Sequence, residues 1–565
     1  MRLTSLSLRN FKAIGSTEQR LEFRPITLLF GPNSAGKSTI VQSLHYFSEI
    51  LTRNNCDPGT TELGGKLDLG GFLNLVYLHD PDTTIELAVG IALDNNLLPS
   101  YGRGNEDEHI LLGEILGTEN LYDLSQVESV DVKLGIRWSR QLNRAYVCFY
   151  SIGVDDVHFA SIHARADQKQ IDLSILNFQH AMFRVPLNKE EDAVTVGEAL
   201  QSLVDEFVAQ PNNTNEETMY IPLQLRSVNG AMPVFDQALP LVPSNDLLDD
   251  DDIDPNKKFT DEERKQVLIR QTEKAAADQR FVLLNGYLSR IIVGSGKLAR
   301  DCLQQFLYLG PLRDIPGRHY SPERSPGLAR WSSGLGAWDQ LYNEGEALTK
   351  KINDWLADDK RLNSGYEVLY DEFKPVSLES ALMVALQTGN ELIESTDWVR
   401  EQLDAIPTRR QVSLRDLRTN IDLYPEDLGT GISQVLPVLV AALGHNKNIV
   451  AIEQPELHVH PKFQVQLGEL FIHAIKDERI AQDTVFILET HSEYMMLRFL
   501  RRLYDTANDE LEPDAYPLIP TDIGVYYVNP SENGVEIVRL NLTEEGEFIE
   551  RWPNGFFPER KRELF

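Results

Sequence analysis

The feature that most constrains this chain is a glycine-containing loop between an apolar run and a helical pattern. The loop contains Gly31, Pro32, Asn33, Ser34, Ala35, Gly36, Lys37 and Ser38, and Thr39 follows it. The run before the loop, residues 26–30, is apolar except for one threonine and predicts a buried strand. After the loop, residues 39–47 repeat apolar side chains at helical spacing. A strand, loop and helix in this order are typical of an α/β fold.

The spacing of this loop predicts a phosphate-binding site. In such a loop, successive backbone amides and the positive end of the following helix surround nucleotide phosphates. Lys37 is then expected to reach the outer phosphates, and the Ser38 hydroxyl to ligate Mg²⁺. ATP and Mg²⁺ are therefore the predicted cofactors. The alternative is a glycine-rich turn without a ligand, but the complete spacing and both flanks favour the phosphate loop.

Composition limits the remaining possibilities. The chain has 565 residues, of which 42% are hydrophobic, and this is enough for two or three domains. Its formal net charge of −32 argues against nucleic-acid binding over the whole surface, so any DNA contact is expected to be local or made by a partner. No apolar run is long enough to cross a bilayer, and the alternating start of the chain has no signal-peptide core. We therefore expect a cytoplasmic protein that makes no membrane contact.

A second glycine-containing stretch lies at residues 428–437. Gly431 is followed closely by Ser433, Gln434 and an apolar helical pattern. The start of such a helix is suited to a phosphate group, because its free amides and its dipole both favour an anion. A glycine hinge before a core helix is the alternative.

Two apolar runs in the second half end in carboxylates. The first, residues 449–452, ends in Glu453, which we expect at the carboxyl edge of a parallel sheet, where it can hold Mg²⁺ through water. The next residue is Gln454, whose neutral amide can orient a water molecule but cannot take its proton. Glu456 is the nearest alternative base. The second run, residues 484–488, ends in the sequence Glu-Thr-His-Ser, which places His491 at the same edge; a capped core histidine is the alternative.

The order of these motifs resembles the ATPase heads of the structural-maintenance-of-chromosomes, RecF and overcoming-lysogenization-defect proteins. A first strand that ends in Asn10-Phe11-Lys12 adds to the resemblance. It implies an ABC-type α/β head with a mixed central sheet, flanking antiparallel strands and a helical insertion. It also implies that two heads sandwich ATP as a head-to-head homodimer or higher oligomer.

The resemblance assigns roles to particular residues. It implies that Gly431, Ser433 and Gln434 form a signature that completes the ATP site of a facing subunit, and that Ser38 and Glu453 serve the metal. It implies a catalytic set at the strand ends: Glu453, Gln454, Glu456 and His491. Family members commonly have glutamate where this chain has Gln454. Hydrolysis is therefore expected to depend on Glu456 or on the substrate itself, or else to be slow, with ATP acting mainly as a clamp.

The predicted division of the chain has four parts. Residues 1–242 and 301–510 form the two halves of the head, 243–300 form an acidic linker and helical insertion, and 511–565 form a small C-terminal module. The helical pattern at 259–292 is too short for the long coiled-coil arms of a chromosome-structuring protein. The aromatic residues at 552–557 fit either core packing or a docking surface.

The predicted function is that of the sensor or regulatory ATPase subunit of a bacterial anti-phage defence system. The overcoming-lysogenization-defect nucleases carry a nuclease domain after the equivalent of His491, and the remaining chain is too short for one. A separately encoded nuclease or toxin is therefore the expected partner. The alternative is a RecF-like ATPase of DNA repair or recombination, which needs a basic face. The best candidates for that face are the arginines of a predicted hairpin: Arg409, Arg410, Arg415 and Arg418. A loop that contains Arg313 and Arg318 is expected to meet either phosphate or acidic side chains.

Overall fold

The computed structural model describes most of the chain. The described residues are 1–54, 56, 69–94, 96–101, 112–113, 124–166, 171–184, 186, 194–205, 223–225, 230–242, 261–318, 320–388, 396–444, 448–477 and 484–553. For residues 223–225, 242 and 261–278 only the backbone is described. The acidic segment at 244–255 and the aromatic residues at 556–557 lie outside these ranges.

A six-stranded sheet forms the centre of the molecule, in the strand order β11-β15-β16-β3-β17-β18. The strands are β3 (Ile26–Phe30), β11 (Phe306–Leu309), β15 (Ile449–Glu453), β16 (Val485–Glu489), β17 (Ile523–Ser531) and β18 (Gly534–Leu540). The first five in the sheet order are parallel, and β18 pairs antiparallel with β17. Because parallel strands share their carboxyl edge, the residues that follow β3, β15 and β16 meet there.

The continuous apolar runs of this sheet are explained by burial on both faces. On β15, Ile449 and Ala451 belong to one apolar core, whereas Val450 and Ile452 belong to another. The same alternation holds on β16. Side chains of a strand alternate between the two faces of its sheet, so a strand that is covered on both faces must be apolar at every position.

A nine-stranded antiparallel sheet covers one side of the centre, in the order β10-β9-β8-β7-β6-β5-β4-β1-β2. Its strands are β1 (Arg2–Arg9), β2 (Gln19–Glu22), β4 (Ile85–Ala92), β5 (Ser129–Ser139), β6 (Arg144–Val154), β7 (Val157–Ala164), β8 (Ile171–Leu176), β9 (Leu223–Leu225) and β10 (Leu241–Val242). The prediction of an α/β fold with a mixed central sheet and flanking antiparallel strands is confirmed.

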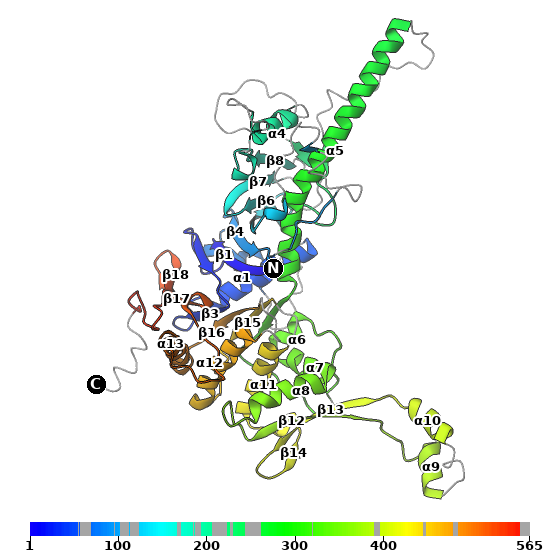
Figure 1. Cartoon of the computed structure of the whole chain (residues 1–565), viewed down its shortest axis with the longest axis vertical. Helices are drawn as coiled ribbons and strands as arrows, with labels where there is room; N and C mark the ends of the chain where they lie inside the picture. The colour runs from blue at the N-terminus through cyan, green and yellow to red at the C-terminus, as the bar shows by residue number, and fades with distance from the viewer. Residues whose placement is uncertain are drawn as a thin grey trace.

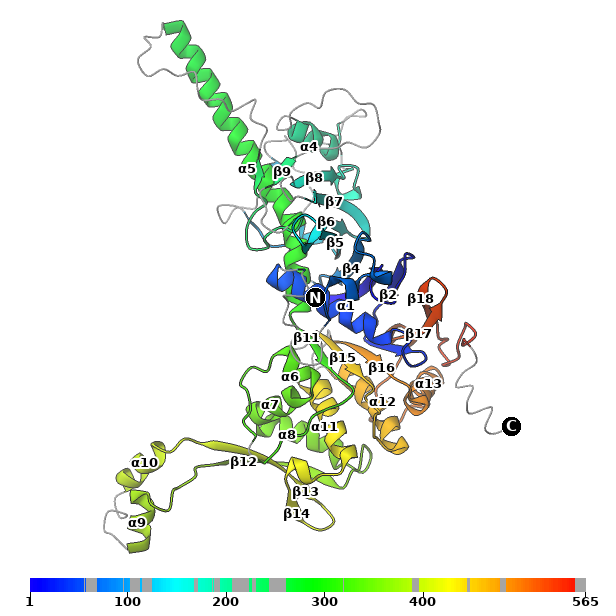
Figure 2. The same cartoon turned by 180° about the vertical axis from the view of Figure 1, so that it is seen from behind.

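The helices lie around these sheets, and two helical elements project from the body. The α-helices are α1 (Lys37–Arg53), α2 (Phe72–Leu75), α4 (Val196–Asp205), α5 (Asp261–Leu303), α6 (Leu328–Ser332), α7 (Leu335–Glu344), α8 (Glu346–Leu356), α9 (Ala381–Thr388), α10 (Thr396–Asp404), α11 (Thr430–Leu443), α12 (Pro461–Lys476) and α13 (Glu493–Ala507). Figure 1 shows α5 running along the antiparallel sheet and beyond it, and Figure 2 shows the same helix from behind.

The second projection is an arm of two strands with two helices at its tip. The arm is built from β12 (Tyr366–Phe373) and β13 (Arg409–Asp416), which pair antiparallel, and β14 (Ile421–Leu423) completes a three-stranded sheet. In both views α9 and α10 lie at the far end of this arm (Figures 1 and 2). Helices α7, α8 and α11 to α13 pack closer to the central sheet and supply much of its second core.

The structure corrects the expected C-terminal boundary. Strands β17 and β18 belong to the central sheet, and β17 lies directly beside β3, so a separate module does not begin at residue 511. Trp552 is buried, and its ring meets Phe30 edge-on at 5.3 Å between ring centroids. This tryptophan therefore packs in the core of the head. The helical pattern predicted at residues 259–292 continues to Leu303 in α5.

Candidate nucleotide site

The phosphate loop connects β3 to α1, as predicted, and two of its glycines are required by its shape. Gly31 has a φ of 146°, and a Cβ atom there would lie 2.4 Å from the carbonyl oxygen of Val528. Gly36 has a φ of 97° and forms the N-cap of α1. Side chains other than hydrogen are strained in this left-handed region, so the turn into α1 selects glycine.

Lys37 is the first residue of α1 and is 3% exposed. Its Nζ donates hydrogen bonds to the carbonyl oxygens of Gly31 at 3.1 Å and Pro32 at 2.9 Å. It also lies 3.7 Å from Oε1 of Glu489. Burial lowers the pKa of Lys37, and the charge of Glu489 opposes this shift. The ammonium group is thus held over the loop, where phosphate oxygens can replace the two carbonyl acceptors.

The tip of the loop is open to solvent. Pro32, Asn33 and Ser34 are exposed, whereas Ala35 is buried and donates its amide hydrogen to Pro32. The first amides of an α-helix have no acceptor within the helix. Those at the start of α1, together with the loop amides, therefore provide the donors that a chain of phosphates needs. Thr39 is buried and shapes the first turn of the helix.

Two carboxylates lie side by side at the same edge of the sheet. Glu453 ends β15, Glu489 ends β16, and the two are register partners. The Ser38 hydroxyl donates a hydrogen bond to Oε2 of Glu489 at 2.9 Å. Burial raises the pKa of Glu453 to about 7, and the charge of Glu489 adds to this shift. Hydrogen bonds from Tyr308 and Ser38 and the charge of Lys37 oppose it.

These groups fit a magnesium site that is shared with a nucleotide. Mg²⁺ prefers six oxygen ligands and usually combines one or two protein ligands with water and phosphate oxygens. A hydroxyl and two carboxylates are the available donors, at Ser38, Glu453 and Glu489. When bound, the ion would neutralise phosphate charge, and these three side chains would orient it. The described part of the chain contains no group of three His, Cys, Asp or Glu side chains suited to a metal.

Glu489 is the site residue that the sequence analysis did not assign. Its position repeats that of Glu453, because each glutamate directly follows a run of four buried residues. This repetition is the sequence signal that identifies Glu489 as a second strand-end carboxylate. Glu489 lies two residues before His491, the residue of this strand end to which the sequence analysis assigned a role.

The other predicted catalytic residues brace the strand ends. Glu456 accepts hydrogen bonds from the Thr490 hydroxyl at 2.9 Å and from the backbone amide of His491 at 2.7 Å. Gln454 has a left-handed φ of 46°, and its backbone N–H donates to the carbonyl oxygen of Glu489 at 2.7 Å. The structure thus brings Glu453, Gln454, Glu456 and His491 together at the edge beside the phosphate loop.

His491 is exposed at this edge. Partial burial of the ring and the neighbouring charge of Lys37 lower the pKa of His491. The ring is therefore neutral near physiological pH and can accept as well as donate a hydrogen bond. A neutral histidine beside phosphate is suited to sensing the nucleotide or orienting water.

The predicted roles of Ser433 and Gln434 require correction. Ser433 is completely buried, and its hydroxyl bonds to the carbonyls of Gly429 and Thr430 at 3.2 and 3.1 Å. Gln434 is 8% exposed and bonds to the backbone of Arg313. Neither side chain is available to a phosphate of a facing subunit. Because α11 begins at Thr430, Ser433 lies one turn inside the helix and faces the core.

The accessible part of this motif is the start of α11, residues 429–431. Gly429 and Thr430 are exposed and Gly431 is partly exposed. A Cβ atom at Gly431 would meet only the carbonyl oxygen of His458, at 3.4 Å. The first amides of a helix have no acceptor within the helix, so the start of α11 is suited to an anion, as the sequence analysis expected.

Three of the four arginines in the candidate basic patch lie beside acidic side chains, whereas the fourth, Arg409, is exposed. Arg410 lies 3.1 Å from Glu372, and Arg415 lies 2.7 Å from Asp422. Arg418 pairs with Asp416 at 3.4 Å. Because each guanidinium already has a carboxylate partner, these three arginines do not form a free basic surface.

Sequence and fold together define a nucleotide-binding α/β protein with a phosphate loop and two carboxylates at one sheet edge. A model of the AAA ATPase domain matches residues 1–135 and 339–496, which is more than half of the chain. The chain belongs to this family of ATPases. Among the helices that the structure describes, none has both the length and the apolar character needed to cross a membrane. No curated protein matches the sequence.

Several solved structures of head domains show a distant likeness. One is the Smc head bound to the C-terminal winged-helix domain of ScpA, with 9% identity, a TM-score of 0.39, and coverage of 96% of this chain and 99% of that chain. A Smc head with an extended coiled coil, bound to the C-terminal domain of ScpA and derived from Pyrococcus furiosus, has 10% identity, a TM-score of 0.37 and coverage of 96% of each chain. The SMC head domain from Thermotoga maritima has 9% identity, a TM-score of 0.35, and coverage of 96% and 100%. Scores this low carry no argument about the function of this chain.

Proposed function

We propose that this protein binds and hydrolyses ATP with Mg²⁺ at a site that a second copy completes. One observation carries the proposal: Lys37 and Ser38 of the phosphate loop contact Glu489, whose register partner is Glu453. These contacts bring hydrogen-bond donors for the phosphates and oxygen ligands for the metal together at one edge of the sheet. The exposed start of α11 supports the second half of the proposal, because its free amides are suited to the γ-phosphate of a nucleotide held by a facing subunit.

Hydrolysis is proposed to be slow. Gln454 is a neutral amide, and both oxygens of Glu456 already accept hydrogen bonds from the next strand end. Glu453, whose pKa is raised to about 7, is partly protonated near neutrality in the ligand-free protein. None of these three is a free, fully ionised base, so an ATP-held dimer is proposed to last long enough to act as a signal.

The Lys37→Ala variant tests the site. ATP binding with Mg²⁺ should be lost, because the variant removes the cation that the phosphate loop itself supplies, and equilibrium titration with a fluorescent ATP analogue measures it. The matched control is Lys297→Ala on α5, which removes a partly exposed lysine that pairs with Asp236. Undiminished binding by Lys37→Ala would refute the assignment of the site.

We propose that the ATP state regulates a separately encoded nuclease or toxin in anti-phage defence. The resemblance to overcoming-lysogenization-defect proteins supports this, and so does the strongly acidic charge of the chain. The neighbouring open reading frame tests the idea, since a nuclease or toxin encoded there is expected.

A RecF-like role in DNA repair is the competing proposal. It requires a basic face, and the pairing of Arg410, Arg415 and Arg418 with acidic residues disfavours one on the arm. DNA binding by the purified protein should therefore be weak at physiological salt. Tight binding that weakens steeply with added salt would favour the repair role instead.

A further inference from the structure

A buried arginine links the two functional elements of one subunit. Arg313 lies in the segment that leaves β11, and we name its residues 310–318 and 320–327 the strap. Arg313 is 3% exposed, although the sequence analysis expected the arginines here to meet phosphate or acidic groups. Arg313 instead donates to backbone carbonyl groups, which belong to α11 and to the end of β15.

The first set of contacts reaches the acidic edge of the site. One guanidinium nitrogen, Nη2, donates to the carbonyl oxygens of Glu453 at 2.9 Å and Gln454 at 3.2 Å. Gln454 is the residue with the left-handed backbone, which is costly for a side chain other than glycine. Arg313 thus holds one side of this strained peptide, and the carbonyl of Glu489 holds the other.

The second set of contacts reaches α11. Nη1 of Arg313 donates to the carbonyl oxygen of Gln434 at 3.2 Å. The backbone amide of Arg313 donates to the Gln434 side chain at 3.3 Å, and the Gln434 amide group donates back to the Arg313 carbonyl at 2.8 Å. This reciprocal pairing fixes the strap to the second turn of α11, directly after the exposed helix start.

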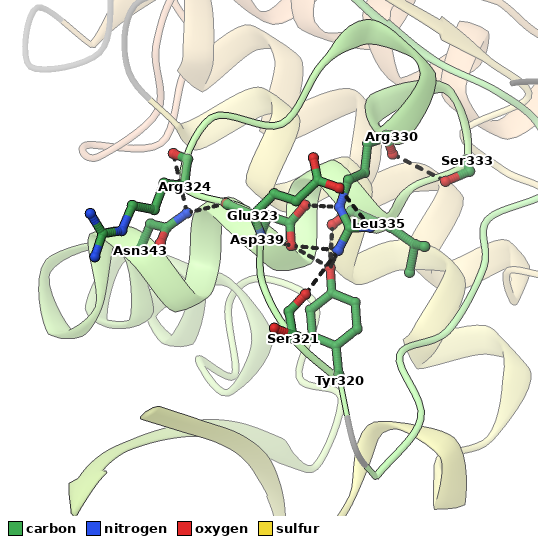
Figure 3. A network of polar contacts seen from close by, with 9 residues as sticks. All are labelled: Tyr320, Ser321, Glu323, Arg324, Arg330, Ser333, Leu335, Asp339 and Asn343. Atoms are coloured by element: carbon green, nitrogen blue, oxygen red, sulfur yellow. Dashed lines mark hydrogen bonds and ion pairs between the residues drawn. The ribbon is translucent and has the colours of Figure 1, made fainter. Parts of the chain in front are cut away.

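Hydrogen bonds hold the strap on both sides of Arg313, so a shift of α11 can be passed through Arg313 to the strand ends. Asp339 on α7 is completely buried and accepts hydrogen bonds from Arg330, from the Tyr320 hydroxyl at 2.6 Å and from the backbone amide of Glu323 at 2.9 Å (Figure 3). Closer to Arg313, the amide of Asp314 donates to the carbonyl of Ser333 at 2.7 Å. The strap is therefore anchored on α7 beyond Arg313.

We propose that Arg313 is a positioning residue that couples the start of α11 to the catalytic edge of its own subunit. The inference rests on the proposed function. A phosphate bound by the facing subunit would contact residues 429–431, and a resulting shift of α11 would move Arg313 and with it the backbone of Glu453 and Gln454. Each site of a dimer would then report its occupancy to the other.

The experiment compares Arg313→Ala with a matched control, Arg290→Ala. Arg290 on α5 is also buried and donates to a backbone carbonyl, that of Leu98, at 3.0 Å. Both variants should lose similar thermal stability. Arg313→Ala should keep ATP affinity close to that of the wild type while kcat falls roughly 10- to 100-fold, as for other residues that orient functional groups. Arg290→Ala should keep both values, and Arg313→Lys should recover part of kcat because it retains donors.

The Gln434→Ala variant and the double variant complete a cycle. If the coupling passes through this pair, the double variant should lose no more kcat than Arg313→Ala alone. Three results would overturn the inference and leave the proposed function standing. They are equal kcat values for Arg313→Ala and Arg290→Ala, a loss confined to ATP affinity, and additive losses of kcat in the cycle. If Arg313→Ala does not fold, Arg313→Lys and Gln434→Ala carry the same test. A wild-type protein that does not hydrolyse ATP would overturn both.

Discussion

The Glu489→Gln variant provides a sharp test of the site, because it keeps the shape of the side chain and removes its charge. The amide oxygen can still accept the hydrogen bond from Ser38. The lost attraction between Nζ of Lys37 and Oε1, which are 3.7 Å apart, is about 4 kcal/mol at an effective dielectric constant of about 20. Relief from burying the charge offsets part of this loss, so the ligand-free protein should remain folded.

The effect on ATP binding should depend on magnesium. With Mg²⁺ present, loss of a carboxylate that orients the metal should weaken binding roughly 10- to 100-fold. With a chelator present, binding should not weaken, because the variant removes a negative charge that repels the phosphates. Titrations of a fluorescent ATP analogue with and without Mg²⁺ measure the ratio.

A matched control separates charge from stability. Glu469→Gln on α12 also removes a partly buried carboxylate, one that accepts a hydrogen bond from Arg502 at 2.6 Å. This variant should bind ATP as the wild type does in both conditions. Equal weakening of Glu489→Gln with and without Mg²⁺, or no weakening at all, would refute the placement of the metal at this edge.

Three further predictions concern stability and the loop. Because the pKa of Glu453 is raised to about 7, the folded protein retains a proton on this residue that the unfolded chain releases. Without Mg²⁺ or ATP, Glu453 should therefore lower the free energy of unfolding by about 3 kcal/mol as the pH rises from about 4.5 to about 7. Urea denaturation measures this decrease, which the Glu453→Gln variant should lack. Asp339→Ala should cost about 3 kcal/mol in the same assay because it leaves Arg330 without its buried partner, whereas Glu323→Ala, at an exposed side chain, should cost little. Gly31→Ala should abolish ATP binding, because the new Cβ atom would meet the Val528 carbonyl at 2.4 Å; unchanged binding would contradict the loop geometry.

The elements that local pattern alone determines could be predicted from the sequence. The apolar runs that became β3, β15 and β16, and the phosphate loop between β3 and α1, have patterns that no other arrangement of this chain explains as well. The place of Glu453 followed directly, because the carboxyl ends of neighbouring parallel strands share one edge.

Features that depend on packing between distant segments could not be predicted. Ser433 has a motif position but no local signal for its burial, which depends on where α11 begins. The segment around Arg313 has the composition of a surface loop, and the burial of Arg313 depends on carbonyl groups more than 100 residues away in the sequence. The pairing of β17 with β3 likewise joins segments from opposite ends of the chain.

We propose above that one subunit's phosphate loop and another subunit's α11 make a single ATP site. Two inactive variants test it when mixed: Lys37→Ala, which lacks the loop cation, and Gly431→Glu, which places a negative charge at a helix start where a Cβ atom meets no closer neighbour than 3.4 Å. In an equal mixture, half of the dimers are mixed and each of these holds one intact site, so ATPase activity should return to at most about a quarter of the wild-type value, and to less than that if each site depends on the occupancy of the other. Activity no higher than the sum of the separate variants would contradict the shared site.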